Sequence, residues 1–186
     1  MCKQVLVIDL ETTGVDARTD SIVQVAAVLL DARTLEEVDV YNTMVRPSTP
    51  ISEGARAVHG LRESDLVSAP ALSSALRTLA RFASPDLRIA GHNVGFDAGF
   101  LRAGYASLGL DYPFDYHAVD VWSIAWFFLS RQGVVLRSYS LDQLRDYFAL
   151  PVPEFHDALL DARASADVLR RVSSDIGAQD WLAHSA

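Results

Sequence analysis

The sequence has one cysteine, Cys2, so no disulfide can form within the chain. A lone thiol fits a reducing, intracellular environment. Long apolar runs are missing as well. Residues 5–8 are too few for the core of a signal peptide. Residues 119–129, which include Asp120 and Ser123, fall far short of the ~20 residues that span a bilayer. We therefore expect a soluble, cytoplasmic protein with no membrane partner.

Basic residues are also scarce. The formal net charge is −8, and Lys3 is the only lysine. This balance argues against a broad basic surface that grips long nucleic acid. It leaves open an enzyme that meets a few phosphates through bound cations, because carboxylates are the ligands that such cations need.

The length and composition fit one domain. The chain has 186 residues, of which 50% are hydrophobic and 22% charged. It shows no internal repeat, low-complexity tract or long linker. We expect a single domain over residues 1–186 with a core from about 4 to 176.

The chain begins with patterns typical of strands and then alternates between helix and strand. Apolar runs predict strands at 4–11, 21–31 and 37–46, joined by short connections. After Pro70 a period near 3.6 appears, and the elements expected from there on are helices at 70–82, 96–108, 121–130, 140–148 and 158–176, with strands at 87–90 and 118–121. This order predicts an α/β domain with a mixed five-stranded sheet, its last two strands parallel to the first and helices on both faces.

Two acids stand in the first predicted strand. Asp9 and Glu11 have apolar neighbours on either side, so the strand should be central and buried on both faces. Residues two apart point to the same face, about 6.6 Å apart along the strand. Like charges there repel each other and are costly to bury unpaired. Two divalent cations roughly 3.5–4 Å apart would satisfy both and could clamp a phosphate. Alternatively, the strand ends by Leu10 and both acids are solvated.

A third acid opens the middle helix. Asp97 ends the segment 91–97, which follows a short strand, and should lie in the first helical turn near the carboxyl end of that strand. Taken alone, an acid there is explained more simply by its favourable interaction with the helix dipole.

A histidine and a fourth acid begin the last helix. Pro151 and Pro153 make the preceding segment a loop that ends at His156. Asp157 is best explained as the N-cap, and Asp161 lies on the second turn among apolar neighbours. A helical carboxylate beside a histidine suits metal-assisted hydrolysis, because histidine, with a reference pKa near 6.5, can take a proton from water. Taken alone, a loop histidine and a solvated acid are the simpler interpretation.

Together these residues resemble the DEDDh exonuclease family, the DnaQ-like 3′–5′ exonucleases. The resemblance extends from about Val5 to Leu169. Five motifs in the family's order carry it, namely D-L-E-T-T-G at 9–14, V-H-G-L at 58–61, the segment 93–97, S-L-D-Q-L at 140–144 and H-D-A-L-L-D-A at 156–162. His156 stands five residues before Asp161, which indicates the histidine form of the family. The implied fold is ribonuclease H-like.

The resemblance implies an enzyme with two divalent cations that releases 5′-mononucleotides from a 3′ end. Asp9, Glu11 and Asp161 would bind one cation. Asp9 would also bridge to the second, which Asp97 would help to hold through water. His156 would be the general base. The all-oxygen ligand set indicates Mg²⁺ or Mn²⁺.

Four further residues fall where family members contact the terminal nucleotide. Thr12 could bond its sugar or phosphate. Val58, His59 and Phe96 could pack on its base, a contact that tolerates any sequence. Phe96 could equally belong to the core.

The motifs do not separate DNA from RNA, because sugar discrimination depends on 2′-hydroxyl contacts that they do not show. The expected partner is the 3′ end of single-stranded DNA or RNA. A DNA exonuclease of the proofreading type is the preferred interpretation. An RNA-trimming enzyme of the RNase T or oligoribonuclease type is the alternative, and a non-catalytic binding subunit is a third. A polymerase or sliding-clamp partner rests only on Q-D-W-L at 179–182, which weakly resembles a clamp-binding peptide but has His184 where an aromatic residue is expected.

Overall fold

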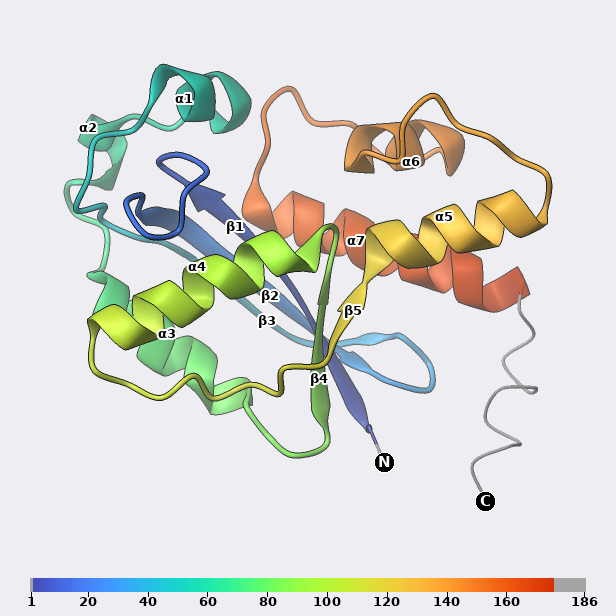
Figure 1. Cartoon of the computed structure of the whole chain (residues 1–186), viewed down its shortest axis with the longest axis horizontal. Coiled ribbons are helices and arrows are strands. Elements are labelled where there is room, and N and C mark those ends of the chain that lie inside the picture. The colour runs from blue at the N-terminus through green and yellow to red at the C-terminus, as the bar shows by residue number, and fades with distance from the viewer. Residues whose placement is uncertain (1, 176–186) are drawn as a thin grey trace.

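The computed structural model describes residues 2–175 and contains one mixed sheet of five strands (Figure 1). The strand order is β3-β2-β1-β4-β5, with β1 in the centre. The first three strands form an antiparallel meander, and β4 and β5 run parallel to β1. The strands are β1 (Gln4–Thr12), β2 (Ile22–Asp31), β3 (Glu37–Met44), β4 (Leu87–Gly91) and β5 (Ala118–Asp120). This arrangement confirms the predicted fold class.

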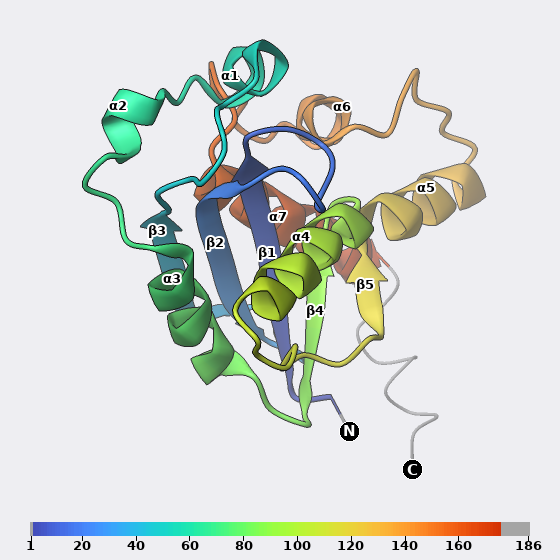
Figure 2. The same cartoon turned by 60° about the vertical axis from the view of Figure 1, so that its left-hand side comes forward.

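Helices cover both faces of the sheet (Figure 2). One apolar core lies between the sheet and the helices α3 and α4, and the other lies between the sheet and α5, α6 and α7. Alternate residues of β1 divide between the two cores, with Leu6 and Ile8 in the first and Val7 in the second, as expected of a strand buried on both faces. The helices are α3 (Leu72–Leu79), extended by a 3₁₀ turn (Ala80–Phe82), α4 (Val94–Ser107), α5 (Val121–Arg131), α6 (Leu141–Tyr147) and α7 (Ala158–Asp175).

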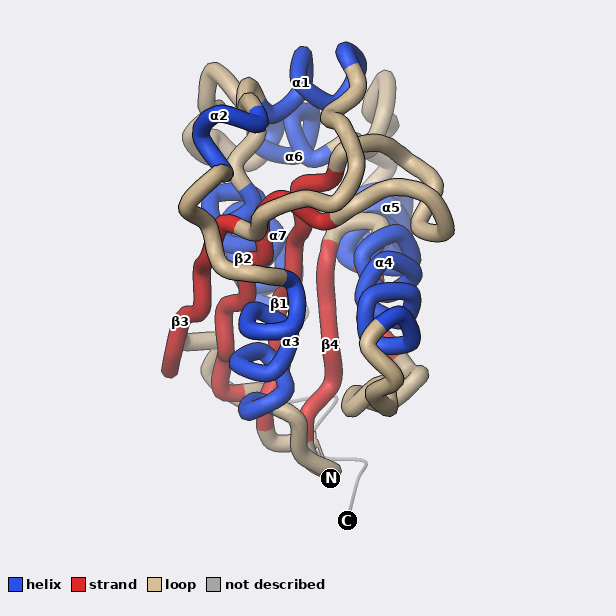
Figure 3. The backbone as a smooth tube through the Cα atoms, turned by 90° about the vertical axis from the view of Figure 1, so that its left-hand side faces the viewer, coloured by secondary structure: helices blue, strands red, loops and turns tan. Residues whose placement is uncertain are grey.

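The carboxyl ends of β1, β4 and β5 lie at one edge of the sheet, as parallel strands require. Two short helices, α1 (Glu53–His59) and α2 (Glu63–Leu66), lie beyond this edge together with α6 (Figure 3). The loop before α7 reaches the same end of the molecule. This edge is therefore where segments from the beginning, middle and end of the chain meet.

The sequence patterns did not predict α1 or α2. In α1 only His59 is buried, so the helix lacks the apolar stripe by which a helix is recognised. Its ends are set by caps instead. Oγ of Ser52 accepts a hydrogen bond from N of Ala55 (3.1 Å), and Gly60 ends the helix in the left-handed conformation (φ 72°).

The other predicted elements are present, with ends that shift by a few residues. β3 ends at Met44, and the helix expected to run to residue 82 finishes as a 3₁₀ turn. Within residues 2–175, no helix is both long enough and apolar enough to cross a membrane.

Candidate active site

The acids of β1 lie where this strand extends beyond its pairing with β4. Pairing with β4 stops at Val7, and β1 continues to Thr12 without it. Asp9 and Glu11 follow Val7 at alternate positions, so all three project toward the face that α7 covers. Asp9 is half-buried and Glu11 is only 6% exposed. The alternative in which both acids are solvated therefore does not hold for Glu11.

Asp97 lies beside the end of β1 that is not paired with β4. It lies in the first turn of α4, is buried, and accepts through Oδ1 a 3.0 Å hydrogen bond from N of Leu10. Gly91, the last residue of β4, lies so close to β1 that an added Cβ would stand 2.8 Å from the carbonyl oxygen of Ile8. Asp97 therefore does more than interact with the helix dipole. It accepts a hydrogen bond from the backbone of β1 between Asp9 and Glu11.

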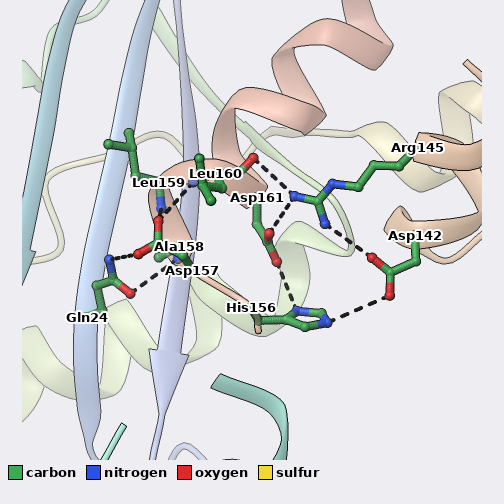
Figure 4. Close-up of polar contacts among 9 residues, drawn as sticks. All are labelled: Gln24, Asp142, Arg145, His156, Asp157, Ala158, Leu159, Leu160 and Asp161. Carbon is green, nitrogen blue, oxygen red and sulfur yellow. Dashed lines mark hydrogen bonds and ion pairs between the residues drawn. The ribbon is translucent and has the colours of Figure 1, made fainter. Parts of the chain in front are cut away.

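Hydrogen bonds of Asp157 and Gln24 fix the beginning of α7 (Figure 4). Asp157 caps the helix as predicted, since its Oδ1 accepts a hydrogen bond from N of Leu160 (3.1 Å). The side chain of Gln24 on β2 donates to Oδ2 of Asp157 (3.0 Å) and accepts from N of Ala158 (3.2 Å). Asp161 follows one turn later, is 3% exposed and faces the acids of β1. It is not a solvated helical acid.

His156, in the loop before α7, contacts residues of α1, α6 and α7. Its backbone N donates to the carbonyl oxygen of Val58 at the end of α1 (3.1 Å). Nδ1 of its ring lies 2.9 Å from Oδ2 of Asp161, and Nε2 lies 3.9 Å from Oδ2 of Asp142 on α6. The side chain is 40% exposed, so water can reach it.

The sequence analysis missed Arg145, which is a fully buried cation in this site. Nη2 donates to Oδ1 of Asp161 (2.6 Å) and to the carbonyl oxygen of Leu160 (3.2 Å), and Nη1 donates to Oδ1 of Asp142 (3.2 Å). A signal was present: Arg145 stands four residues after the buried Leu141, on the inner face of a short helix. An arginine in an apolar stripe needs a buried acceptor.

The acids on the β1 side all have raised pKa values. Burial raises the pKa of Glu11 to about 7, and the charge of Asp161 adds to the shift. Although Asp9 is half-buried as a residue, desolvation of its carboxylate raises its pKa well above the usual value, and the charge of Asp97 raises it further. Burial also raises the pKa of Asp97. These carboxylates are crowded, and no cation of the described protein balances them directly.

On the α7 side the acid shifts the other way. Burial alone would raise the pKa of Asp161, but hydrogen bonds from His156 and Arg145 outweigh it and lower the pKa below its usual value. The same hydrogen bond to Asp161 raises the pKa of His156. Asp161 is therefore held as a charged carboxylate by its neighbours.

The residues at this edge fit a divalent cation. Glu11, His156 and Asp161 each place one possible ligand atom within 4.8 Å of the others. Oε1 of Glu11 is buried and finds no hydrogen-bond partner in the part of the chain that the structure describes. A buried carboxylate oxygen without a partner is costly, and a cation bound there would satisfy it. The three residues thus form a possible metal-binding cluster.

Two of the four residues expected to contact a nucleotide present some surface. Val58 is 46% exposed at the end of α1. Phe96 is half-buried in the first turn of α4 and packs against Phe100, with ring centroids 4.9 Å apart. Their predicted contact with a base stays a prediction.

The other two, Thr12 and His59, are buried and bonded to the protein. Oγ1 of Thr12 donates to the carbonyl oxygen of Gly14 (2.6 Å). Nδ1 of His59 accepts from N of Leu61 (3.0 Å), so Nε2 carries the proton and donates to the carbonyl oxygen of Thr12 (3.2 Å). Both residues shape the end of β1, and their predicted contact with substrate also stays a prediction.

Residues 6–169 match the RNase_T family model, which is described as Exonuclease. The DNA polymerase III PolC-type protein of Thermotoga maritima is 33% identical over 167 residues, which make up 89% of this chain and 12% of that protein. A DNA polymerase III subunit epsilon-like protein of Rhodobacter capsulatus is 34% identical over 171 residues, 90% of this chain and 23% of that protein. The chain thus spans less than a quarter of the length of these relatives.

Solved structures with a similar fold include those of E. coli exonuclease I. Its complex with a dT13 oligonucleotide has a TM-score of 0.82 at 20% identity and covers 92% of this chain and 41% of that one. The zinc-bound form of its complex with single-stranded DNA has a TM-score of 0.84 at 20% identity, with 98% and 43% covered. This similarity agrees with the predicted ribonuclease H-like fold.

Proposed function

Because this chain belongs to the exonuclease family, we propose that it is a metal-dependent 3′–5′ exonuclease that acts on DNA and releases 5′-mononucleotides. One observation carries the proposal: the buried Oε1 of Glu11, without a hydrogen-bond partner among the described residues, faces Asp161 and His156. After burial, the charge of Asp97 is the next largest cause that raises the pKa of Asp9. Such a cluster is expensive unless cations complete it.

In this proposal Asp9, Glu11 and Asp161 hold one cation, and Asp9 with Asp97 holds a second. The oxygen ligands favour Mg²⁺ or Mn²⁺. Bound divalent cations lower the pKa of water and stabilise charge on an attacked phosphate. The protein contributes the positions of its ligands. Asp97 is fixed by its bond to Leu10, and Asp161 is fixed by Arg145.

His156 is the proposed general base. In the neutral ring, Nδ1–H donates a hydrogen bond to Oδ2 of Asp161. Nε2 then keeps a lone pair that can accept a proton from water. As water attacks phosphorus, that proton passes to Nε2 and the bond from phosphorus to the 3′ oxygen breaks. The products are a 5′-mononucleotide and a chain one nucleotide shorter with a 3′ hydroxyl.

DNA is the proposed substrate because the relatives reported above are named as DNA polymerase III proteins. The E. coli exonuclease I structures, which share the fold, contain dT13 or single-stranded DNA. Val58 and Phe96 flank the candidate site with exposed apolar surface, and we propose that they pack on the terminal base. Thr12 and His59 would support the end of β1 beneath it. Association with a polymerase or clamp is a further part of this proposal, and the peptide at 179–182 that suggested a clamp lies outside the described residues.

The test uses single-stranded DNA and RNA of matched sequence, labelled at the 5′ end and incubated with Mg²⁺, Mn²⁺ or EDTA. We expect stepwise shortening from the 3′ end that requires metal and is faster on DNA. Faster shortening of RNA would replace the DNA assignment with the RNA-trimming alternative. No shortening of either, by protein shown to be folded, would contradict the proposed activity.

A matched pair of variants on α7 links the activity to the site. Asp161→Asn changes a buried acid in the cluster, whereas Asp167→Asn changes a half-buried acid six residues later that pairs with Arg170. We expect Asp161→Asn to abolish shortening and Asp167→Asn to leave it unchanged. Equal losses in both variants would mean that the helix, rather than the acid, is what the reaction needs.

A further inference from the structure

Arg145 is a buried arginine whose two terminal nitrogens are both bonded to the protein. It is 1% exposed, between the buried Leu144 and the beginning of α7. Its guanidinium makes three hydrogen bonds, to Asp161 at 2.6 Å, to the carbonyl oxygen of Leu160 at 3.2 Å and to Asp142 at 3.2 Å (Figure 4). A side chain so enclosed cannot contact a phosphate of the substrate without leaving all three partners.

The bond to Asp161 divides the two oxygens of this carboxylate between different neighbours. Arg145 occupies Oδ1, while Oδ2 faces His156 at 2.9 Å. One ligand atom from each of Glu11, His156 and Asp161 lies within 4.8 Å of the other two. Arg145 can therefore stay on Oδ1 while Oδ2 serves as a ligand.

We propose that Arg145 is a positioning residue that pairs with Oδ1 of Asp161 and fixes the orientation of this carboxylate before any metal binds. The inference rests on the proposed function, since it concerns a ligand of the proposed metal site. Arg145 acts as a resident cation: it offsets one of the crowded carboxylates and fixes the rotamer of Asp161, so the α7 side of the site is assembled without metal.

A purely structural role makes a different prediction. Arg145 joins α6 to α7 through Asp142 and Leu160, and a simple tie between helices would stabilise the fold equally with and without metal. A resident cation matters most when metal is absent, because Arg145 and the ionisable ring of His156 are then the groups that pair with Asp161. The dependence of stability on metal therefore separates the two roles.

The experiment measures the thermal unfolding midpoint of the full chain in EDTA and in saturating Mn²⁺, for the wild type and for Arg145→Met. Methionine keeps the apolar stem but removes the partner of Oδ1 of Asp161, so this buried carboxylate keeps only its contact with His156. In EDTA we expect the midpoint to fall by on the order of 10 °C. Mn²⁺ should recover a large part of that loss, so its stabilising shift should be several degrees larger in the variant than in the wild type.

Two further variants keep the test decisive. Arg145→Lys retains a charge but loses the planar fork, so its shift with Mn²⁺ should lie between those of the wild type and Arg145→Met. It also serves if Arg145→Met does not fold in EDTA. Arg163→Met is the matched control on α7: Arg163 pairs with Glu37 at 2.9 Å on the surface, and its loss should change the midpoint little and equally in both conditions.

The outcomes distinguish this inference from the function on which it rests. If Mn²⁺ stabilises the wild type and Arg145→Met by the same amount, Arg145 is only a helix tie and the inference is overturned while the metal site stands. If Mn²⁺ stabilises neither the wild type nor any variant, the metal site itself fails, and the proposed function fails with it. A larger shift in Arg145→Met, graded through Arg145→Lys, supports the resident cation.

Discussion

The two sides of the candidate site contain similar acids in opposite electrostatic states. On the β1 side, Asp9, Glu11 and Asp97 are desolvated and crowd one another, so their pKa values are raised. On the α7 side, Asp161 is as buried as Asp97, yet its pKa is lowered because Arg145 and His156 donate hydrogen bonds to it. Burial raises the pKa of all four acids, and the pKa is lowered only at Asp161, where Arg145 and His156 outweigh burial.

This difference indicates how the site would bind metal. The α7 side is completed by the protein itself and can be assembled in advance. The β1 side holds its carboxylates in place through the backbone, as in the bond from Leu10 to Asp97, but leaves their charges unbalanced. A metal cation would thus stabilise the β1 side most, and changes on the two sides should have different consequences.

The largest effect is expected from Asp9→Ala on the β1 side. Asp9 is proposed to touch both cations, so its loss should reduce turnover by about 10⁴-fold or more. The same change relieves repulsion among buried carboxylates, and the metal-free midpoint should rise by about 3 °C. Turnover is followed on labelled single-stranded DNA and the midpoint by circular dichroism in EDTA.

Asp39→Ala is the matched control for Asp9→Ala, because Asp39 is an exposed strand acid on β3. It should change neither quantity. Near-normal turnover of Asp9→Ala at any metal concentration would remove Asp9 from the site.

The next largest effect is expected from His156→Ala on the α7 side. Loss of the proposed general base should lower turnover by about 10²–10⁴-fold. Because Asp161 keeps Arg145 as its partner, the affinity for Mn²⁺ should stay nearly unchanged, which a calorimetric titration can measure. If affinity and turnover fell by the same factor, His156 would be a ligand rather than the base.

How far the site could be predicted from the sequence differs between its two sides. The motif residues were predicted from the order of the motifs along the chain, because taken alone a residue such as Asp161 has a simpler explanation. The partners that set their charges were not. Leu10 and Asp97 are 87 residues apart, and their bond depends on where β4 stops.

Arg145 and His59 show the same limit of local patterns. Arg145 meets Asp161 only when α6 folds onto α7, which no periodicity indicates. His59 matches a motif but is buried against the end of β1 and bonded to Thr12. A short helix such as α1, held by caps rather than by an apolar stripe, escapes patterns of hydrophobicity altogether.

A third prediction concerns pH and follows from the β1 side. Burial raises the pKa of Glu11 from 4.5 to about 7, so the folded protein binds this proton more tightly than the unfolded chain does. The metal-free protein should therefore lose stability as the pH rises from about 4.5 to 7, by about 3 kcal/mol for this group alone. His156, whose pKa is also raised, contributes in the same direction.

On the α7 side, the stability that Asp161 contributes should change with pH in the opposite direction, and at lower pH. The pKa of Asp161 is lowered, so its contribution is lost as the pH falls below its usual value of 3.8. Urea unfolding in EDTA at pH 5 and pH 8 should show greater stability at pH 5, and Mg²⁺ should reduce the difference because metal and protons compete for the carboxylates. Equal stability at both pH values in EDTA would mean that folding does not raise the pKa values of the β1 acids.

The smallest effect is expected from Gly60→Ala, which disturbs only the support of His156. Gly60 has a φ of 72°, and an added Cβ would lie 3.2 Å from the ring of Phe155 in the loop before α7. The substitution should cost about 1 kcal/mol of stability. Because the ring of Phe155 must shift, turnover should fall severalfold while the affinity for Mn²⁺ is unchanged.

Gly54→Ala in the same helix separates this effect from a general change in α1. A Cβ there meets nothing within 4 Å, so alanine should stabilise the helix slightly, by about 0.5 kcal/mol, and leave turnover unchanged. If both glycine variants lowered turnover alike, α1 as a whole would support catalysis. If neither did, the loop would hold His156 without help from α1, through the bonds that His156 itself makes to Asp161.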